Sequence, residues 1–346
     1  MMNRLHSKNH YVPECYLQRW ENSAGKVYVY RTLVSHPNVP IWKPYFVSAI
    51  AYQRHLYTQV ISGNESDALE TWLDREFESP ANPILEKATC NRRLSKQDWE
   101  ILIKFLAAQD VRTPAKLLEH LKRMPKILGI TLKETLQELK RKLKNEGIDS
   151  IKNYSKTKNT GQFPIKVNTH IEEGAEEGIL KANTYAGRST WIHSIKHLLN
   201  HTSEILHTHK WSIIKPAKGY FWPTSDNPVV KVNYYSPGKY DLKGGWGNPK
   251  GNILFPIGPE HALFVQIDDR PIPKGSRVSE QLTKELIKFI VGNANRLIFC
   301  NTEDVDIPRI RKRIIDQDRL KRENEGMKNW LKENADMERE YFFRSK

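Results

Sequence analysis

The sequence predicts an α+β protein that is helix-rich and has a small, mostly antiparallel sheet. Strand-like runs occur in both halves: residues 26–31 alternate in polarity, and 253–257 with 262–265 form a hairpin pattern across Gly258 and Pro259. Helical periodicity dominates elsewhere, most clearly after the capping sequence at 95–98, where apolar residues recur along one broad face. Antiparallel hairpins accompanied by separate amphipathic helices are typical of this fold class.

Four segments follow from changes in composition. Residues 1–115 are expected to form the N-terminal helical and hairpin part of the core, and 186–305 the α+β remainder of the same core. Residues 116–185 are expected to be a basic helical insertion with a mobile loop, because residues 116–158 carry 12 basic and 5 acidic side chains. Residues 306–346 carry 12 basic and 9 acidic side chains and are expected to be a charged helical tail, which forms either a solvated arm or an oligomer contact.

The charge balance indicates a polyanionic partner. The 346 residues have a formal net charge of +15, which favours nucleic acid first and an anionic surface second. Within the insertion, we expect nucleic acid to contact Lys140, Arg141, Lys142 and Lys144; a solvated basic face is the alternative.

The remaining composition argues against a membrane or secreted protein. No segment approaches the ~18 apolar residues of a membrane span, and the first residues lack the apolar stretch of a signal peptide. The three cysteines are far apart without CxxC spacing, which argues against disulfides or a zinc knuckle. We therefore expect a cytoplasmic protein with no membrane partner.

Candidate polar residues occur at the ends of predicted helices. His10 precedes a helix that can start at Glu14 after Pro13, and its imidazole titrates near neutrality. Glu70 lies beside the apolar seam of a helix from residue 66, which Pro80 and Pro83 are expected to break.

Gln109 and Arg112 share one face near the end of the next helix. The planar guanidinium of Arg112 suits a carboxylate or a phosphate, so an internal salt bridge and a binding role are both open.

The stretch 224–228 is a polar tip between two strand-like runs. Asp226 and Asn227 can bond back to nearby backbone, and Pro228 fixes the exit. Such a tip is either a turn or a site.

Three motifs together carry a resemblance. The runs at 9–13, 109–114 and 224–228 resemble, in order and spacing, the uncharacterised bacterial family called domain of unknown function 4238. Glu14 stands where the family usually has glutamine. The resemblance implies no established activity.

Two functions remain in view. In the first, His10, Glu70, Gln109, Arg112, Asp226 and Asn227 converge as a nuclease-like phosphodiesterase site, and its expected role is defence against foreign nucleic acid. There Glu70 and Asp226 hold Mg²⁺ or Mn²⁺, His10 is a base or ligand, and Arg112 steadies a phosphate. No P-loop, GxSxG or HExxH motif enforces this site. In the alternative, the same residues form a structural network in a non-catalytic nucleic-acid- or protein-binding scaffold. A small-molecule or nucleotide hydrolase is a third, weaker interpretation.

Overall fold

The computed structural model describes residues 7–61, 64–146, 165–171, 178–184 and 187–343. The chain divides into two compact units: one contains Met1–Ala115 with His197–Lys346, and the other contains Lys116–Lys196. Along the described residues, no helix is both long and apolar enough to cross a membrane. The α+β class is confirmed, since long helices accompany small antiparallel sheets.

The larger sheet of the first unit is five-stranded and antiparallel, in the order β10-β15-β14-β12-β13. Its strands are β10 (Ser212–Ile214), β12 (Val230–Ser236), β13 (Lys239–Asp241), β14 (Gly251–Gly258) and β15 (His261–Gln266). The predicted hairpin is therefore confirmed as β14 and β15. The β14 strand is buried along nearly all of its length, as expected for a strand covered on both faces.

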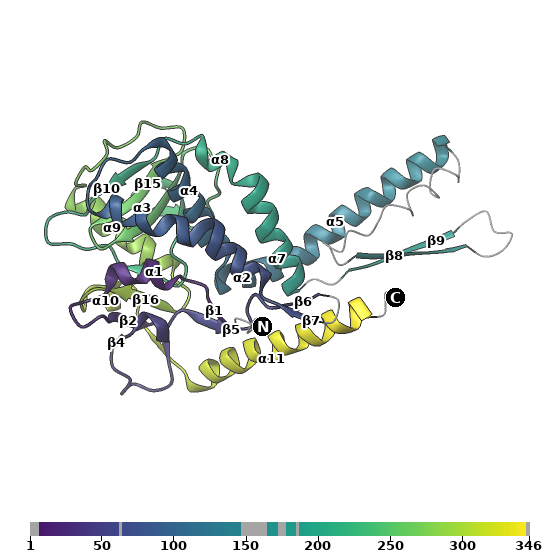
Figure 1. The fold of residues 1–346 in the computed structure, drawn as a ribbon, viewed down its shortest axis with the longest axis horizontal. Coiled ribbons are helices and arrows are strands. Elements are labelled where there is room, and N and C mark those ends of the chain that lie inside the picture. Colours follow the sequence, from purple (N-terminus) through teal and green to yellow (C-terminus); the bar gives the residue numbers. More distant parts are fainter. Residues whose placement is uncertain (1–6, 62–63, 147–164, 172–177, 185–186, 344–346) are drawn as a thin grey trace. The chain divides into compact units, whose positions relative to one another are not determined.

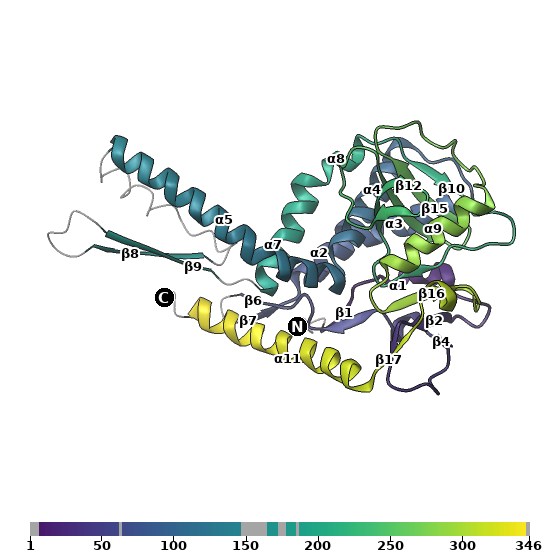
Figure 2. The ribbon, with the colours of Figure 1, turned by 180° about the vertical axis from the view of Figure 1, so that it is seen from behind.

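Helices cover both faces of this sheet. The helices α3 (Ser79–Thr89) and α4 (Lys96–Val111) lie on one face, and α9 (Glu280–Asn293) lies on the other (Figures 1 and 2). Adjacent side chains of β14 pack against the helices on opposite faces of the sheet. Leu254 packs in the cluster that includes Phe289 of α9, whereas the ring of Phe255 lies 6.0 Å from that of Phe105 in α4.

A second antiparallel sheet has the order β11-β16-β2-β4. It is made of β2 (Val27–Arg31), β4 (Trp42–Tyr45), β11 (Thr224–Ser225) and β16 (Leu297–Cys300). Among its described residues the unit also has three two-stranded sheets: β1 (Lys8–His10) with β5 (Tyr52–Arg54), β6 (Gln59–Ile61) with β7 (Asn64–Ser66), and the parallel pair β3 (Leu33–Val34) with β17 (Ile314–Ile315).

Local signals fix the ends of several helices. The helix α1 (Glu14–Leu17) begins directly after Pro13 and continues as a 3₁₀ turn, Gln18–Trp20. At the start of α4 the Ser95 hydroxyl accepts the Asp98 N–H, and the Asp98 carboxylate accepts the Ser95 N–H. The predicted capping box is therefore present. Further helical segments of this unit include a 3₁₀ turn at Val47–Ala49, α2 (Ala68–Leu73), α8 (Glu204–His207), α10 (Ile307–Ile310) and α11 (Gln317–Phe343).

Three expectations are wrong in detail. Pro80 and Pro83 do not break the chain, because α2 continues through a π-helical turn (Asp74–Glu78) into α3. Pro80 lies just after the π-helical turn, where the regular α-helical hydrogen bonding that a proline would interrupt is already altered, and Pro83 lies inside α3. Residues 211–215 and 220–224 also have the sequence pattern of two paired strands, but β10 pairs with β15 instead. The long tail helix begins at Gln317, after β17, rather than near residue 306.

The second unit contains the basic insertion. It consists mainly of α5 (Pro114–Glu146), which runs through Pro125, and a hairpin of β8 (Ile165–Ile171) and β9 (Gly178–Thr184). The helix α7 (Arg188–His197) closes it, and a π-helical turn, Leu198–Thr202, follows. The hydroxyl of Thr190 lies 3.1 Å from the Nε2 atom of His120, which ties α7 to α5. The basic loop expected after α5 lies outside the described residues.

Candidate functional site

The best-connected predicted residue is Arg112, which forms the C-terminal cap of α4 and has no exposed surface. Its guanidinium forms an ion pair with Glu78 and donates to the carbonyl of His10 at 2.7 Å. Its Nε atom lies 3.3 Å from the Tyr57 hydroxyl, and Glu70 lies 3.6 Å from its Nη2 atom. Every side of the guanidinium is thus occupied by the protein itself.

Burial controls the protonation of the acids around Arg112. It raises the pKa of Glu70 to about 7, with Arg112 opposing the change and Glu78 adding to it. Glu70 is 21% exposed and also accepts a backbone hydrogen bond from His10. Burial acts against the charge of Arg112, but Glu78, Tyr57 and Glu70 outweigh it, so the pKa of Arg112 is raised. Arg112 therefore stays charged, while Glu70 titrates close to neutral pH.

The side chain of His10 lies at the edge of this cluster. Its Nε2 atom is 3.3 Å from a carboxylate oxygen of Glu14, and burial is the main cause that lowers the pKa of His10. The Nε2 atom of His10 and the Oε2 atom of Glu70 are both buried, and neither has a hydrogen-bond partner within the described part of the chain. The two atoms most suited to proton transfer therefore do not face solvent.

The carboxylate of Asp226 is occupied by hydrogen bonds from backbone N–H groups. Its carboxylate accepts N–H groups of three successive residues, Asn295 at 2.7 Å, Arg296 at 2.7 Å and Leu297 at 3.0 Å. Burial raises the pKa of Asp226 to about 6, and the same three N–H groups oppose that change. With 3% of its surface exposed, Asp226 holds the turn between α9 and β16.

Asn227 extends the same network. Its amide nitrogen donates to the carbonyl of Asn293 at 3.0 Å, and Asn293 donates back to the Asn227 carbonyl at 2.8 Å. The hydroxyl of Thr113 donates to the Asn227 side-chain oxygen at 3.2 Å. Residues 224–228 thus link the end of α4 to the end of α9. These contacts correspond to the turn that the sequence offers as one of its two interpretations.

Asp110 and Gln109, which precede Arg112 on α4, differ in whether their polar side-chain atoms have partners. Asp110 pairs with Lys231 at 2.5 Å and accepts the indole N–H of Trp246 at 2.7 Å. Gln109 is fully buried, and among the described residues neither its amide nitrogen nor its amide oxygen has a hydrogen-bond partner. A buried amide without partners is uncommon in native proteins and costs stability.

Five of the six predicted residues therefore fall into two groups, and Gln109 belongs to neither. His10, Glu70 and Arg112 lie together around the Arg112 guanidinium, whereas Asp226 and Asn227 belong to the turn network. Searched over the described residues, no group of three or more His, Cys, Asp or Glu side chains could hold a metal ion. A metal held by Glu70 and Asp226 stays a prediction.

The basic residues predicted to contact nucleic acid lie on α5 of the second unit. Lys140 and Arg141 are exposed. The side chains of Lys142 and Lys144 are outside what the structure describes. Their binding role also stays a prediction.

The sequence prediction missed a groove of about 850 Å³ in the first unit. Three segments line it: the start of α4, the stretch from α8 into β10, and the chain after β15. Its lining is basic and aromatic, with Lys96, Trp99, Glu100, Ile103, Lys104, Glu204, His207, His209, Lys210, Trp211, Ser212, Pro271, Ile272, Pro273 and Lys274. The sequence does contain one signal, since Lys96, Glu100 and Lys104 recur at spacing four beside Trp99.

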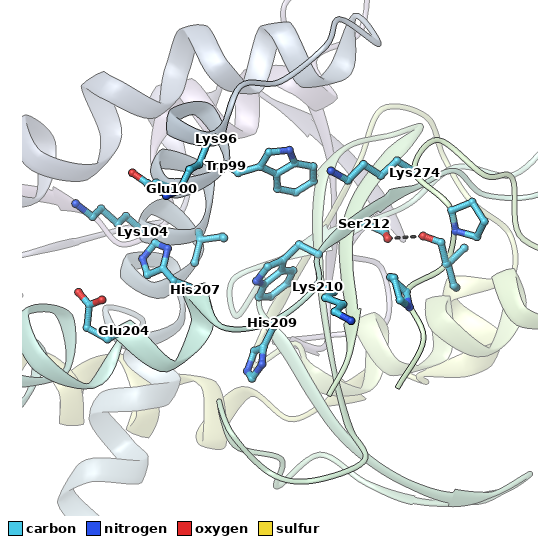
Figure 3. Close-up of a pocket in the computed structure, with 15 residues that line it drawn as sticks. Lys96, Trp99, Glu100, Lys104, Glu204, His207, His209, Lys210, Ser212 and Lys274 are labelled. Atoms are coloured by element: carbon cyan, nitrogen blue, oxygen red, sulfur yellow. Dashed lines mark hydrogen bonds and ion pairs between the residues drawn. The ribbon is translucent and has the colours of Figure 1, made fainter. Parts of the chain in front are cut away.

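Trp99 and Lys274 face each other across this groove (Figure 3). The Lys274 ammonium lies 4.6 Å from the centre of the Trp99 ring. The Trp211 indole is fixed below the surface, because its N–H donates to the Leu206 carbonyl at 2.7 Å. We call this site the Trp99 groove.

Comparisons with known proteins give a family and nothing beyond it. The family model described as "Protein of unknown function (DUF4238)" matches residues 8–304. No curated protein and no solved structure matches the chain. The matched range includes both the Arg112 cluster and the Trp99 groove.

Proposed function

The chain belongs to the DUF4238 family, which brings no activity with it, and from the chain's own residues we propose a non-catalytic nucleic-acid-binding protein. In this proposal the predicted catalytic residues are structural. The observation that carries it is the closed Arg112 cluster, in which Arg112 has no exposed surface and the Nε2 atom of His10 and the Oε2 atom of Glu70 are buried. A catalytic group has to reach its substrate.

The partner class rests on charge. The net charge of +15 attracts a polyanion, and the lysines of the Trp99 groove are exposed beside an indole ring. Nucleic acid combines phosphates with aromatic bases and so matches both features. The widely spaced cysteines fit the reducing cytoplasm in which such a protein would act.

The test is binding and cleavage measured on the same preparation. Fluorescence anisotropy with labelled single-stranded DNA, single-stranded RNA and duplex DNA should show binding that weakens as salt rises. The same substrates should stay intact after incubation with Mg²⁺ or Mn²⁺. Failure to bind any of the three at 50 mM salt would refute the proposal, because electrostatic binding is strong under that condition.

A phosphodiesterase is the second candidate, and one observation favours it. Glu70 has a pKa of about 7 and 21% of its side chain exposed, so it could exchange a proton near neutral pH. Its substitution Glu70→Gln keeps the shape but removes the acid. Cleavage by the wild type that Glu70→Gln abolishes, with binding retained, would replace the first proposal by this one.

A further inference from the structure

We propose that the Trp99 groove holds a segment of single-stranded nucleic acid, with a base stacked on Trp99 and phosphates on the surrounding lysines. This inference rests on the proposed function and names its site and substrate class. The groove lies apart from the Arg112 cluster on α4. The thirteen positions from Trp99 to Arg112 place the two side chains roughly 140° apart around the helix axis.

The stacking surface is the indole of Trp99. Its ring is partly exposed, and the Lys274 ammonium already lies 4.6 Å from the ring centre. A cation over an indole marks an accessible, electron-rich face. An unpaired base can take that position, because stacking on an aromatic side chain tolerates any base. Lys274 then moves from the ring to the phosphate of the stacked nucleotide.

The charges of the groove suit a backbone of phosphates. Four lysines line it against two glutamates, and one of those glutamates, Glu100, lies 3.9 Å from Lys96. Lys104 and Lys210 are exposed, and in the described part of the chain no acid pairs with either of them. Ammonium groups without a partner in the protein are available to phosphate. An acidic peptide would satisfy the lysines but would leave the Trp99 ring unused.

The walls of the groove are already fixed without a ligand. The Ser212 hydroxyl donates to the Ile272 carbonyl (Figure 3), and the Gly275 N–H donates to the Ile213 carbonyl at 2.7 Å. On the other side, the capping box anchors the first turn of α4, which carries Trp99. A site that needs little ordering loses less free energy on binding.

The groove should distinguish single strands from duplexes. In a duplex each base is paired and stacked within the helix, so none can reach the Trp99 ring without being unpaired. A single strand presents its bases freely. Duplex DNA should therefore bind through its phosphates alone.

The experiment compares a labelled 12-nucleotide oligothymidylate with a 12-base-pair duplex by anisotropy. Trp99→Ala should weaken single-strand binding about tenfold or more and leave duplex binding nearly unchanged. Trp99→Phe, which keeps an aromatic ring, should retain most of the affinity. A variant that joins Lys104→Ala to Lys274→Ala should weaken both ligands. Lys288→Ala, an exposed lysine of α9 outside the groove, is the matched control.

The outcomes distinguish failure of the groove proposal from failure of nucleic-acid binding as a whole. If Trp99→Ala and the Lys104 and Lys274 variant bind like wild type while Lys140→Ala with Arg141→Ala does not, the groove is overturned and nucleic-acid binding stands. If wild type binds neither ligand, both proposals fall. Equal loss of duplex and single-strand affinity in Trp99→Ala would overturn the stacking claim. Thermal melting of each variant identifies unfolding, and the Trp99→Phe result decides the case if Trp99→Ala does not fold.

Discussion

The guanidinium of Arg112 forms an ion pair with the carboxylate of Glu78, and Arg112 has no exposed surface. Removing one partner of such a pair leaves the other charge buried without compensation. We expect Arg112→Ala to lower the free energy of unfolding by about 3–5 kcal/mol, as measured by urea denaturation. The exposed pair of Arg75 with Glu76 offers the matched control, and Arg75→Ala should change stability by less than about 0.5 kcal/mol.

Asp226 allows the structural and catalytic interpretations to be separated. Asp226→Ala would leave three partly buried backbone N–H groups without their acceptor, and each such loss costs about 1–3 kcal/mol when the group is shielded from water. We expect a loss of about 3 kcal/mol or more in unfolding free energy, together with a clearly lower melting temperature. Asp336→Ala, which removes an exposed acid paired with Arg339, is the control. An unchanged or raised melting temperature for Asp226→Ala would favour an active-site role.

The sequence predicted those parts of the fold that depend on neighbours in the chain. The Ser95 capping box and the β14–β15 hairpin are set by residues a few positions apart, so pattern and turn chemistry suffice. The partners of Asp226 lie about 70 residues further along, and those of Arg112 come from β1, α2 and the turn after it. Pattern alone left a turn and a site equally open for Asp226, because only the tertiary fold supplies its three donors. The Trp99 groove was missed for the same reason, since it joins three separate segments.

Glu70 should make stability depend on pH. Its pKa is about 7 in the folded protein against an ordinary value of 4.5, so the folded state binds its proton more tightly than the unfolded state. The contribution of Glu70 is therefore fully present below about pH 4.5 and is lost as pH rises through about 7. Glu70→Gln cannot ionise, and its stability relative to wild type should improve by about 3 kcal/mol over that range.

Urea denaturation at pH 4.5, 6 and 8 measures this effect. Glu76→Gln removes an acid of the same region that is 46% exposed, and its stability difference from wild type should stay nearly constant. A constant difference for Glu70→Gln as well would show that the pKa of Glu70 is the same in the folded and unfolded states and that the cluster is open to water.

The salt dependence of nucleic-acid binding should report how many lysines contact phosphate groups. For single strands, the logarithm of the binding constant falls with the logarithm of salt by about 0.7 per neutralised phosphate. Replacing Lys104 and Lys274 together should reduce this slope by roughly 1.4, while Lys288→Ala leaves it unchanged. Titrations at four salt concentrations between 50 and about 200 mM suffice. An unaltered slope in the double variant would place the phosphate contacts elsewhere on the protein.

Substitution of Gln109 tests whether a buried polar side chain of α4 only destabilises the protein or binds a water or a ligand. Its amide is fully buried and, among the described residues, has no hydrogen-bond partner, so the folded protein loses about 1–3 kcal/mol by desolvating it. Gln109→Met has a similar volume and no amide, and it packs beside the alanines at 107 and 108 on the same buried stretch of α4. We expect the melting temperature of Gln109→Met to rise, because the desolvation cost disappears while the packing is kept. Gln109→Glu is the opposing control, and it should destabilise the protein because it places an acid in the same buried position. A lower melting temperature for Gln109→Met would mean that a water or a ligand satisfies the amide in solution, and nucleic-acid affinity measured on the same variant would then tell which of the two it is.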